Sequence, residues 1–153
     1  MTTSTTDRIE KQILLRAPRS RVWRALTDSQ EFGAWFKAVL DQPFVEGKRV
    51  AGRITHPGYE HVTMEMQIVR MDPERLFSYR WHPYAIEPGV DYSVEATTLV
   101  EFRLEETPGG TRLSVVESGF DQLPSSRRNE AFRMNEGGWS EQLRNIERHV
   151  SPA

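Results

Sequence analysis

Three polar residues could do chemistry inside this protein. Counting by twos along the strand patterns places His56, Tyr79 and Glu117 on faces that are otherwise apolar. In an apolar cavity these groups could orient the polar end of a ligand, and in an enzyme His56 or Glu117 would serve as the acid or base. Each of them could equally lie at a rim with its polar tip in water.

A second group of side chains could bind a metal. His56, Glu60 and His61 fall within six residues of one another. Pro57-Gly58 is typical of a turn, and no third ligand with a known metal-site spacing occurs elsewhere. Two histidines in a turn are more often exposed to solvent, so we expect no metal and no cofactor. A phosphate-binding glycine loop and a nucleophile elbow are also absent from the sequence, and whether the protein is an enzyme stays open.

Most aromatic residues have the periodicity of inward-facing positions. They could form the wall of an apolar ligand site, with methionines adapting to the ligand. They could also be ordinary core, which is the commoner role of such residues. The complete set of predicted ligand-binding residues is Trp35, Phe36, His56, Met64, Met66, Phe77, Tyr79, Trp81, Glu117, Phe120, Phe132 and Trp139.

The elements that must position these residues begin with a strand ending at Leu15. Two short helices follow, the first starting near Pro18 and the second near Asp28, which is spaced from Glu31 as in a capping box. From Val39 to Glu117 the pattern has period two, interrupted by turns. Each strand has one apolar face and one polar face, which predicts an antiparallel meander covered on one side.

The cover is predicted at the end of the chain. Apolar residues at helical spacing form one stripe, which contains Phe132, Trp139, Leu143, Ile146 and Val150. A helix over residues 127–150 would be about 36 Å long, and Ser125 or Ser126 could cap it. Gly137-Gly138 lies within this helix, which predicts either a bend or the close approach of another backbone.

Composition limits the classes of function. The chain has 153 residues, enough for one domain, and we expect a disordered tail over 1–7 followed by a single domain over 8–153. A net charge of −2 disfavours nucleic acid as a partner. Without cysteine there is no disulfide or thiolate, which fits a cytoplasmic protein. No stretch is apolar enough to span a membrane.

Several phrases of the sequence, in this order, resemble a known superfamily. The chain resembles the helix-grip superfamily of birch-pollen allergens, lipid-transfer START domains and polyketide cyclases, and within it the group named for a heat-shock-protein ATPase activator. The resembling phrases are Val22 to Asp28 with Trp35-Phe36, Asp72 to Leu76 leading into Tyr79-Arg80-Trp81, Gly110 to Leu113, Glu117 to Phe120, and Gly138-Trp139.

The resemblance implies an α+β helix-grip fold: a curved antiparallel sheet of six to seven strands wrapped around a long C-terminal helix, with two short helices after the first strand. It also implies a cavity between sheet and helix that takes apolar small molecules in many members, without a common catalytic motif. Three functions stay open. They are the binding of a small apolar or aromatic ligand, a cyclase- or hydrolase-type reaction using an acid or base in the cavity, and a chaperone-associated protein interaction. A homodimer is a further alternative, and a loop over 83–96 could close the cavity or contact another subunit.

Overall fold

The computed structural model describes residues 7–83, 91 and 94–151. The described helices and strands are, in chain order, β1 (Arg8–Leu15), α1 (Arg19–Thr27), α2 (Ser29–Phe36), β2 (Ala38–Leu40), β3 (Arg49–Ile54), β4 (Thr63–Asp72), β5 (Leu76–Trp81), β6 (Thr98–Thr107), β7 (Gly110–Ser118), the 3-10 turn η2 (Phe120–Gln122) and α3 (Arg128–Val150). This order of elements is the one the sequence predicts.

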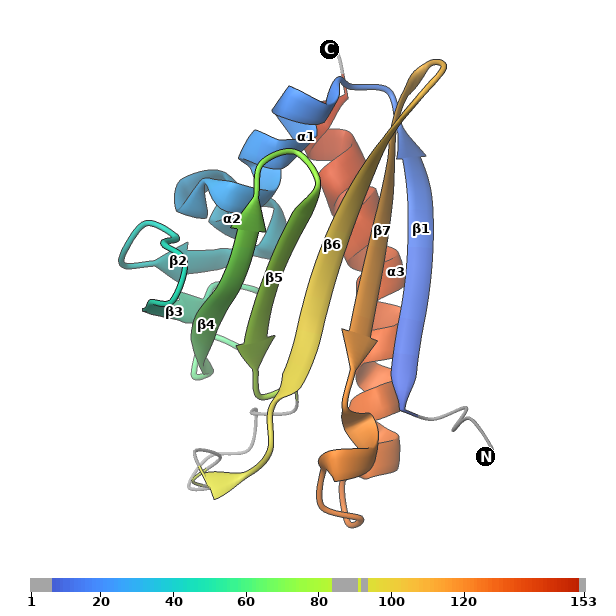
Figure 1. Cartoon of the computed structure of the whole chain (residues 1–153). Coiled ribbons are helices and arrows are strands. Elements are labelled where there is room, and N and C mark those ends of the chain that lie inside the picture. Colours follow the sequence, from blue (N-terminus) through green and yellow to red (C-terminus); the bar gives the residue numbers. More distant parts are fainter. Residues whose placement is uncertain (1–6, 84–90, 92–93, 152–153) are drawn as a thin grey trace.

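All seven strands form one antiparallel sheet (Figure 1). Strands β2 to β7 follow one another as a meander. The last of them, β7, pairs with β1, the first strand of the chain, which gives the order β1-β7-β6-β5-β4-β3-β2. In this last pair Ile9 lies opposite Glu117 and Ile13 lies opposite Leu113. The structure therefore has the α+β class and the helix-grip arrangement expected from the sequence, with seven strands.

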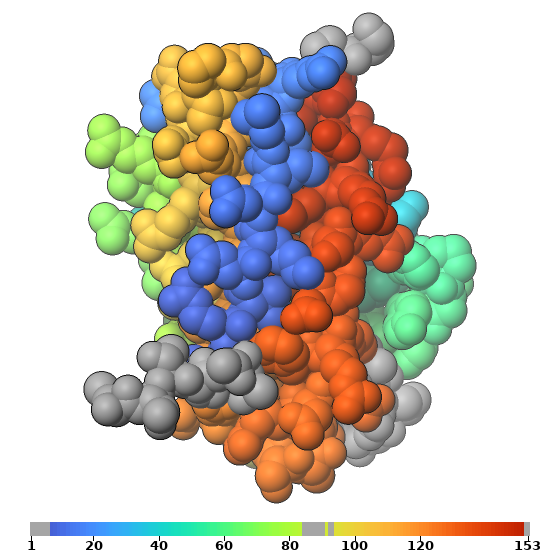
Figure 2. Space-filling view, turned by 90° about the vertical axis from the view of Figure 1, so that its right-hand side faces the viewer, coloured from blue at the N-terminus to red at the C-terminus, as the bar shows by residue number. Residues whose placement is uncertain are grey.

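Helix α3 covers the inner face of this sheet. It runs behind the strands in Figure 1, and Figure 2 shows it alongside β1 on one side of the molecule. Trp139, Leu143, Ile146 and Val150 are buried, whereas Phe132 is partly exposed and packs at the edge of the core. The apolar stripe of the sequence is thus the face of α3 that meets the sheet.

Helix α2 begins as the sequence predicts, whereas α3 does not. Asp28 caps α2, because its carboxylate accepts hydrogen bonds from the backbone N–H groups of Gln30 (2.9 Å) and Glu31 (3.1 Å). The prediction that Ser125 or Ser126 caps α3 was wrong. The backbone N–H groups of Arg127 and Arg128 both donate to the carbonyl of Pro124, so a turn occupies these positions and α3 begins at Arg128.

The glycine pair in α3 does not mark a close contact. Helix α3 is unbroken from Arg128 to Val150, and a Cβ atom built on Gly137 or on Gly138 would meet nothing within 4 Å. The predicted approach of another backbone is therefore wrong. Ahead of β1, the carbonyl of Asp7 accepts hydrogen bonds from the backbone N–H groups of Gly119 and Phe120.

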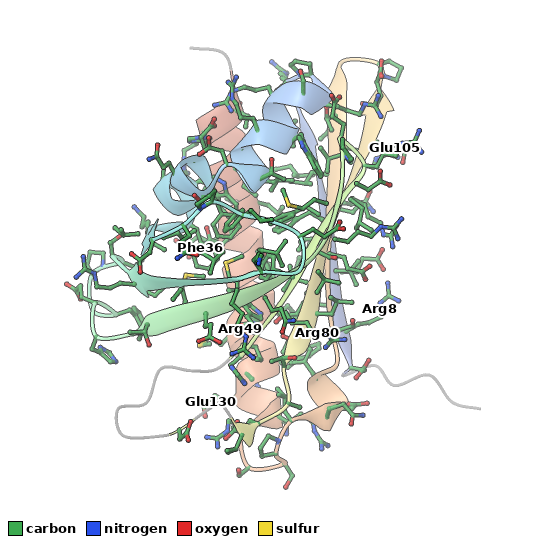
Figure 3. The ribbon with its side chains drawn as sticks, turned by 60° about the vertical axis from the view of Figure 1, so that its left-hand side comes forward. Arg8, Phe36, Arg49, Arg80, Glu105 and Glu130 are labelled. Carbon is green, nitrogen blue, oxygen red and sulfur yellow. The ribbon has the colours of Figure 1, made fainter. Side chains whose placement is uncertain are left out.

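The outer face of the sheet carries charged residues. Figure 3 shows Arg8 and Glu105 pointing away from α3 on this side. Neighbouring charges of opposite sign pair here, including Arg49 with Glu65 at 3.3 Å. Within the described part of the chain, no helix is long and apolar enough to cross a membrane.

Candidate functional site

The most unusual side chain of the interior is the carboxylate of Glu117. It is fully buried, on the inner face of β7. Oε1 accepts hydrogen bonds from Asn135 Nδ2 and Trp139 Nε1, each at 2.8 Å. Oε2 accepts from Trp81 Nε1 at 2.8 Å and from Thr98 Oγ1 at 2.5 Å. Four donors thus occupy the hydrogen-bonding capacity of the two carboxylate oxygens.

These four donors come from three different elements. Trp81 ends β5, Thr98 begins β6, and Asn135 and Trp139 lie one turn apart on α3. Side chains four residues apart point to the same side of a helix, so one carboxylate can bind both of the latter. Glu117 therefore connects three neighbouring strands of the sheet to the helix that covers them.

Burial has the largest effect on the pKa of Glu117. Burial raises the pKa of its carboxyl group, and the hydrogen bonds from Thr98, Trp81, Trp139 and Asn135 work in the opposite direction, with a net rise. None of these partners carries a positive charge. An indole N–H can only donate, and one indole donates to each carboxylate oxygen of Glu117. Both oxygens therefore act as acceptors.

Tyr79 contributes a second buried polar group. It is fully buried on the inner face of β5, and its hydroxyl has no hydrogen-bond partner among the residues that the structure describes. Burial raises the pKa of Tyr79 far above its usual value, and the charge of Glu117 adds to this rise. A buried donor without an acceptor costs about 1–3 kcal/mol, so this hydroxyl is a place where a ligand's acceptor would be stabilising.

Aromatic rings surround these two polar groups. The ring centroid of Tyr79 lies 5.4 Å from that of Trp81 and 6.2 Å from that of Phe32. Phe36 lies within 5.7 Å of both of these flanking rings, and Trp81 continues to Trp139 at 5.8 Å. Tyr79 and Phe32 are fully buried, whereas Phe36 and Trp81 are partly exposed. Phe36 and Trp81 are thus the outer members of this aromatic cluster, and Figure 3 shows Phe36 on α2 beside the interior.

The other apolar residues predicted for the site lie in three places. Trp35 and Phe77 belong to the same cluster as Tyr79, each with its ring centroid 6.4 Å from that of Phe102. Met64 and Met66 are buried on the inner face of β4. Phe120 and Phe132 form a separate pair, 5.3 Å apart, where η2 meets the first turns of α3.

The placement of His56 on the inner face was wrong. Strand β3 ends at Ile54, two residues before the position to which the alternation was extended. His56 is exposed, its ring lies 5.7 Å from that of Tyr59, and its Nδ1 lies 3.0 Å from the carbonyl of Pro57. In the part of the chain that the structure describes, no three His, Asp or Glu side chains are arranged to bind a metal.

A shallow recess lies at the end of β5 next to the start of α3. It is lined by His82, Pro83, Glu95, Ala96, Leu123 and Arg127. The Arg127 guanidinium forms an ion pair with the Glu95 carboxylate across it. Most of the predicted loop, residues 84–90 and 92–93, lies outside the described residues, so its predicted role as a lid remains a prediction.

Sequence reasoning missed two of the partners of Glu117. Thr98 has the same alternation as Val100 and Phe102, which places it on the inner face. Asn135 lies four residues before Trp139, on the apolar stripe of α3. A polar residue at an inward position was therefore visible in both cases. The sequence did not contain the strand register that brings Thr98 to Glu117, or the docking of α3 that brings Asn135 there, because both depend on long-range contacts.

Comparison with protein families gives one match that covers most of the chain. The family described as activator of Hsp90 ATPase homolog 1-like protein matches residues 16–151. A search of curated proteins gave no significant match.

Solved structures with the same fold come from several bacteria. A protein from Arthrobacter aurescens is 18% identical, with a TM-score of 0.76 over 97% of this chain and 88% of that one. A protein from Mesorhizobium loti is 20% identical, with a TM-score of 0.74 over 94% and 96% of the two chains. The Aha1 dimer from Colwellia psychrerythraea is 14% identical, with a TM-score of 0.71 over 94% and 96%. At these identities the similarity establishes the fold.

Proposed function

The chain belongs to the activator of Hsp90 ATPase homolog 1-like family, and from that premise we propose that it binds a small apolar molecule between its sheet and α3. Members of this fold serve as ligand-binding or interaction domains. The proposed site comprises the aromatic cluster of Phe36, Tyr79, Trp81 and Trp139, together with Met64. Burial of the ligand's apolar surface would supply the binding energy, at about 25 cal/mol per Å².

The observation that carries this proposal is the unpartnered hydroxyl of Tyr79 within an otherwise aromatic interior. Ligand sites are mostly apolar with a few placed polar groups, and this interior has that composition. Because the hydroxyl is out of contact with solvent, a ligand would reach it when Phe36 moves. Phe36 is partly exposed, so its displacement breaks fewer core contacts than that of Phe32.

The enzyme alternative has less support from the geometry. An acid or base must exchange a proton with a substrate, yet each oxygen of Glu117 already accepts two hydrogen bonds. His56, the other candidate, is exposed in a turn. A reaction in this interior would therefore require Glu117 to lose one of its present partners.

The interaction alternative is favoured by the family description and by the solved Aha1 dimer. Exposed apolar residues such as Leu14 on β1 and Val39 on β2 could contact a partner or a second copy. They lie on opposite edges of the sheet rather than in one patch. Sedimentation equilibrium of the wild type and of Leu14→Glu tests a dimer that uses the β1 edge.

The ligand-binding proposal is tested by the indole N–H signals of the protein in ¹H–¹⁵N NMR spectra during titration with naphthalene. Trp81 and Trp139 donate to Glu117, whereas Trp35 donates to the carbonyl of Ala25. We expect the signals of Trp81 and Trp139 to shift in a saturable manner. The signal of Trp23 should change least, because its ring packs against Phe77, at 6.5 Å, and reaches the site only through that residue.

Two variants sharpen this test. Single Trp→Phe substitutions assign the four indole signals. Arg80→Gln, on the same strand as Tyr79 but exposed on the opposite face, should leave the titration unchanged. If the Trp81 and Trp139 signals stay fixed at saturating naphthalene, or if every indole signal shifts equally without saturation, the interior does not bind this class of molecule.

A further inference from the structure

We propose that the interior site takes an uncharged aromatic molecule that offers one hydrogen-bond acceptor, such as an aryl ketone, and rejects aryl carboxylates. This inference rests on the proposed function and names the chemical class of the ligand. It follows from the hydrogen-bonding capacity that remains free on the two buried polar groups, Glu117 and Tyr79.

The first step concerns Glu117, whose hydrogen-bonding capacity is used within the protein. Its four donors come from Trp81, Thr98, Asn135 and Trp139, at 2.5–2.8 Å. A donor group on a ligand would have to displace one of them, and two of them are indoles fixed by packing against other rings. A ligand donor such as an amine or alcohol therefore finds no free acceptor on this carboxylate.

The second step concerns Tyr79, which has a hydroxyl donor to offer. The rings around it, those of Phe32, Phe77, Trp81 and Phe102, supply no acceptor. A carbonyl or ether oxygen on the ligand would satisfy this buried donor, and leaving it unsatisfied is what costs free energy. The polar end of the ligand must therefore include an acceptor, because only an acceptor satisfies the hydroxyl hydrogen.

The third step concerns charge. Glu117 and Tyr79 interact electrostatically, so an acceptor bound at Tyr79 would also lie within the field of Glu117. No described cation contacts Glu117, because its four partners are neutral. A ligand carboxylate would therefore place a second acidic group in the same interior, and two carboxylates in such a site do not both ionise readily. An anionic ligand would have to take up a proton to bind.

The fourth step concerns the shape of the ligand. The rings of Phe36, Trp81 and Trp139 follow one another at centroid distances of 5.7–5.8 Å. Aromatic rings at such distances gain from tilted or edge-to-face contacts beyond the burial of area. A flat aromatic molecule that displaces Phe36 would make the same kind of ring contact with Trp81.

Three matched probes test this inference with the full-length chain. Naphthalene, 2-acetonaphthone and 2-naphthoate share one ring system and differ in the polar group. Dissociation constants come from the indole N–H shifts of Trp81 and Trp139 at pH 7. We expect 2-acetonaphthone to bind about threefold to tenfold more tightly than naphthalene. We expect 2-naphthoate to bind more than about tenfold more weakly than the ketone, and to improve as the pH is lowered.

The variant Tyr79→Phe isolates the hydrogen bond. It removes a hydroxyl that has no described partner, so it should fold as the wild type does. It should abolish the advantage of the ketone, so that the ratio of the dissociation constants of naphthalene and 2-acetonaphthone falls towards one. Arg80→Gln, with its side chain on the outer face, should keep both affinities.

The outcomes separate the two proposals. If none of the three probes shifts the Trp81 and Trp139 signals, the proposed function fails. If naphthalene binds but the ketone gains nothing, or gains the same in Tyr79→Phe, the inference about the acceptor is overturned. If 2-naphthoate binds as tightly as the ketone at pH 7, the exclusion of anions is overturned.

Discussion

Two glutamates fix α3 to the rest of the protein, and they do so by different physics. Glu117 binds the first half of the helix through Asn135 and Trp139 and is surrounded by neutral donors. Glu31, on α2, binds the end of the helix, because its Oε1 lies 3.0 Å from His149 Nε2 and 2.6 Å from Arg21 Nη1. Its Oε2 accepts from Arg24 Nε at 2.8 Å. One anchor is buried and lacks a cation, and the other is half-buried among cations.

The pKa of Glu117 is raised from its usual value, whereas the pKa of Glu31 is lowered. For both residues, burial acts to raise the pKa. At Glu117 the neutral hydrogen bonds only reduce this rise. At Glu31 the hydrogen bonds of His149 and Arg21, with the charges of Arg21 and Arg24, outweigh burial and lower the pKa. The comparison shows that the number of donors alone does not decide the sign: Glu117 is fully buried with neutral donors, whereas Glu31 is only partly buried and has cationic donors.

The largest expected effect is that of Glu117→Ala. It leaves four donors without their acceptor, three of them buried and one partly buried, and it opens a cavity on β7. We expect the free energy of unfolding to fall by about 3–5 kcal/mol, at the upper end for single substitutions. Urea denaturation followed by tryptophan fluorescence measures this change.

The matched control is Glu65→Ala. Glu65 is a strand glutamate whose side chain is 59% exposed and pairs only at the surface, so we expect a change within about 0.5 kcal/mol. Equal losses for the two variants would contradict the assignment of Glu117 as an anchor.

The second prediction concerns pH, where the two anchors should diverge. A raised pKa in the folded state gives a contribution that is complete below the unfolded value near 4.5 and is lost as the pH rises through the folded value. A lowered pKa gives a contribution that is present above 4.5 and is lost as the pH falls through the folded value. As the pH rises from 4, the free energy of unfolding of the wild type should therefore fall relative to that of Glu117→Gln. Over the same range it should rise relative to that of Glu31→Gln.

Urea denaturation at half-unit steps from pH 3.5 to pH 8 measures both curves. Glu105→Gln, on the exposed outer face, corrects for the general effect of removing one negative charge. Two curves that run parallel after this correction would contradict the opposite pKa shifts of the two anchors.

The contrast between the anchors also marks what sequence can predict. Periodicity is local, so it identified the strands, the stripe of α3, and the inward position of Glu117. The cap at Asp28 was likewise readable, since capping involves neighbours in sequence. His56 failed because alternation was extended beyond the end of β3. Glu117 joins residues that lie 18 to 36 positions away, and Glu31 binds α3 through His149, which lies 118 positions away. Only the paired strands and the docked helix bring such residues together.

The smallest expected effect tests whether the anchor at Glu117 compensates for a weak section of α3. Gly137 and Gly138 lie between Asn135 and Trp139, the two helical residues that Glu117 binds. Glycine in a helix interior costs about 0.8–1 kcal/mol relative to alanine, and a Cβ at Gly137 would meet nothing within 4 Å. Gly137→Ala should therefore stabilise the protein by up to about 1 kcal/mol. If Glu117 holds this section helical, the gain should be larger in the Glu117→Gln background than in the wild type, as a double-mutant cycle by urea denaturation measures. Strict additivity would mean that α3 is held there by its packing alone, and that Glu117 serves the strands rather than the helix.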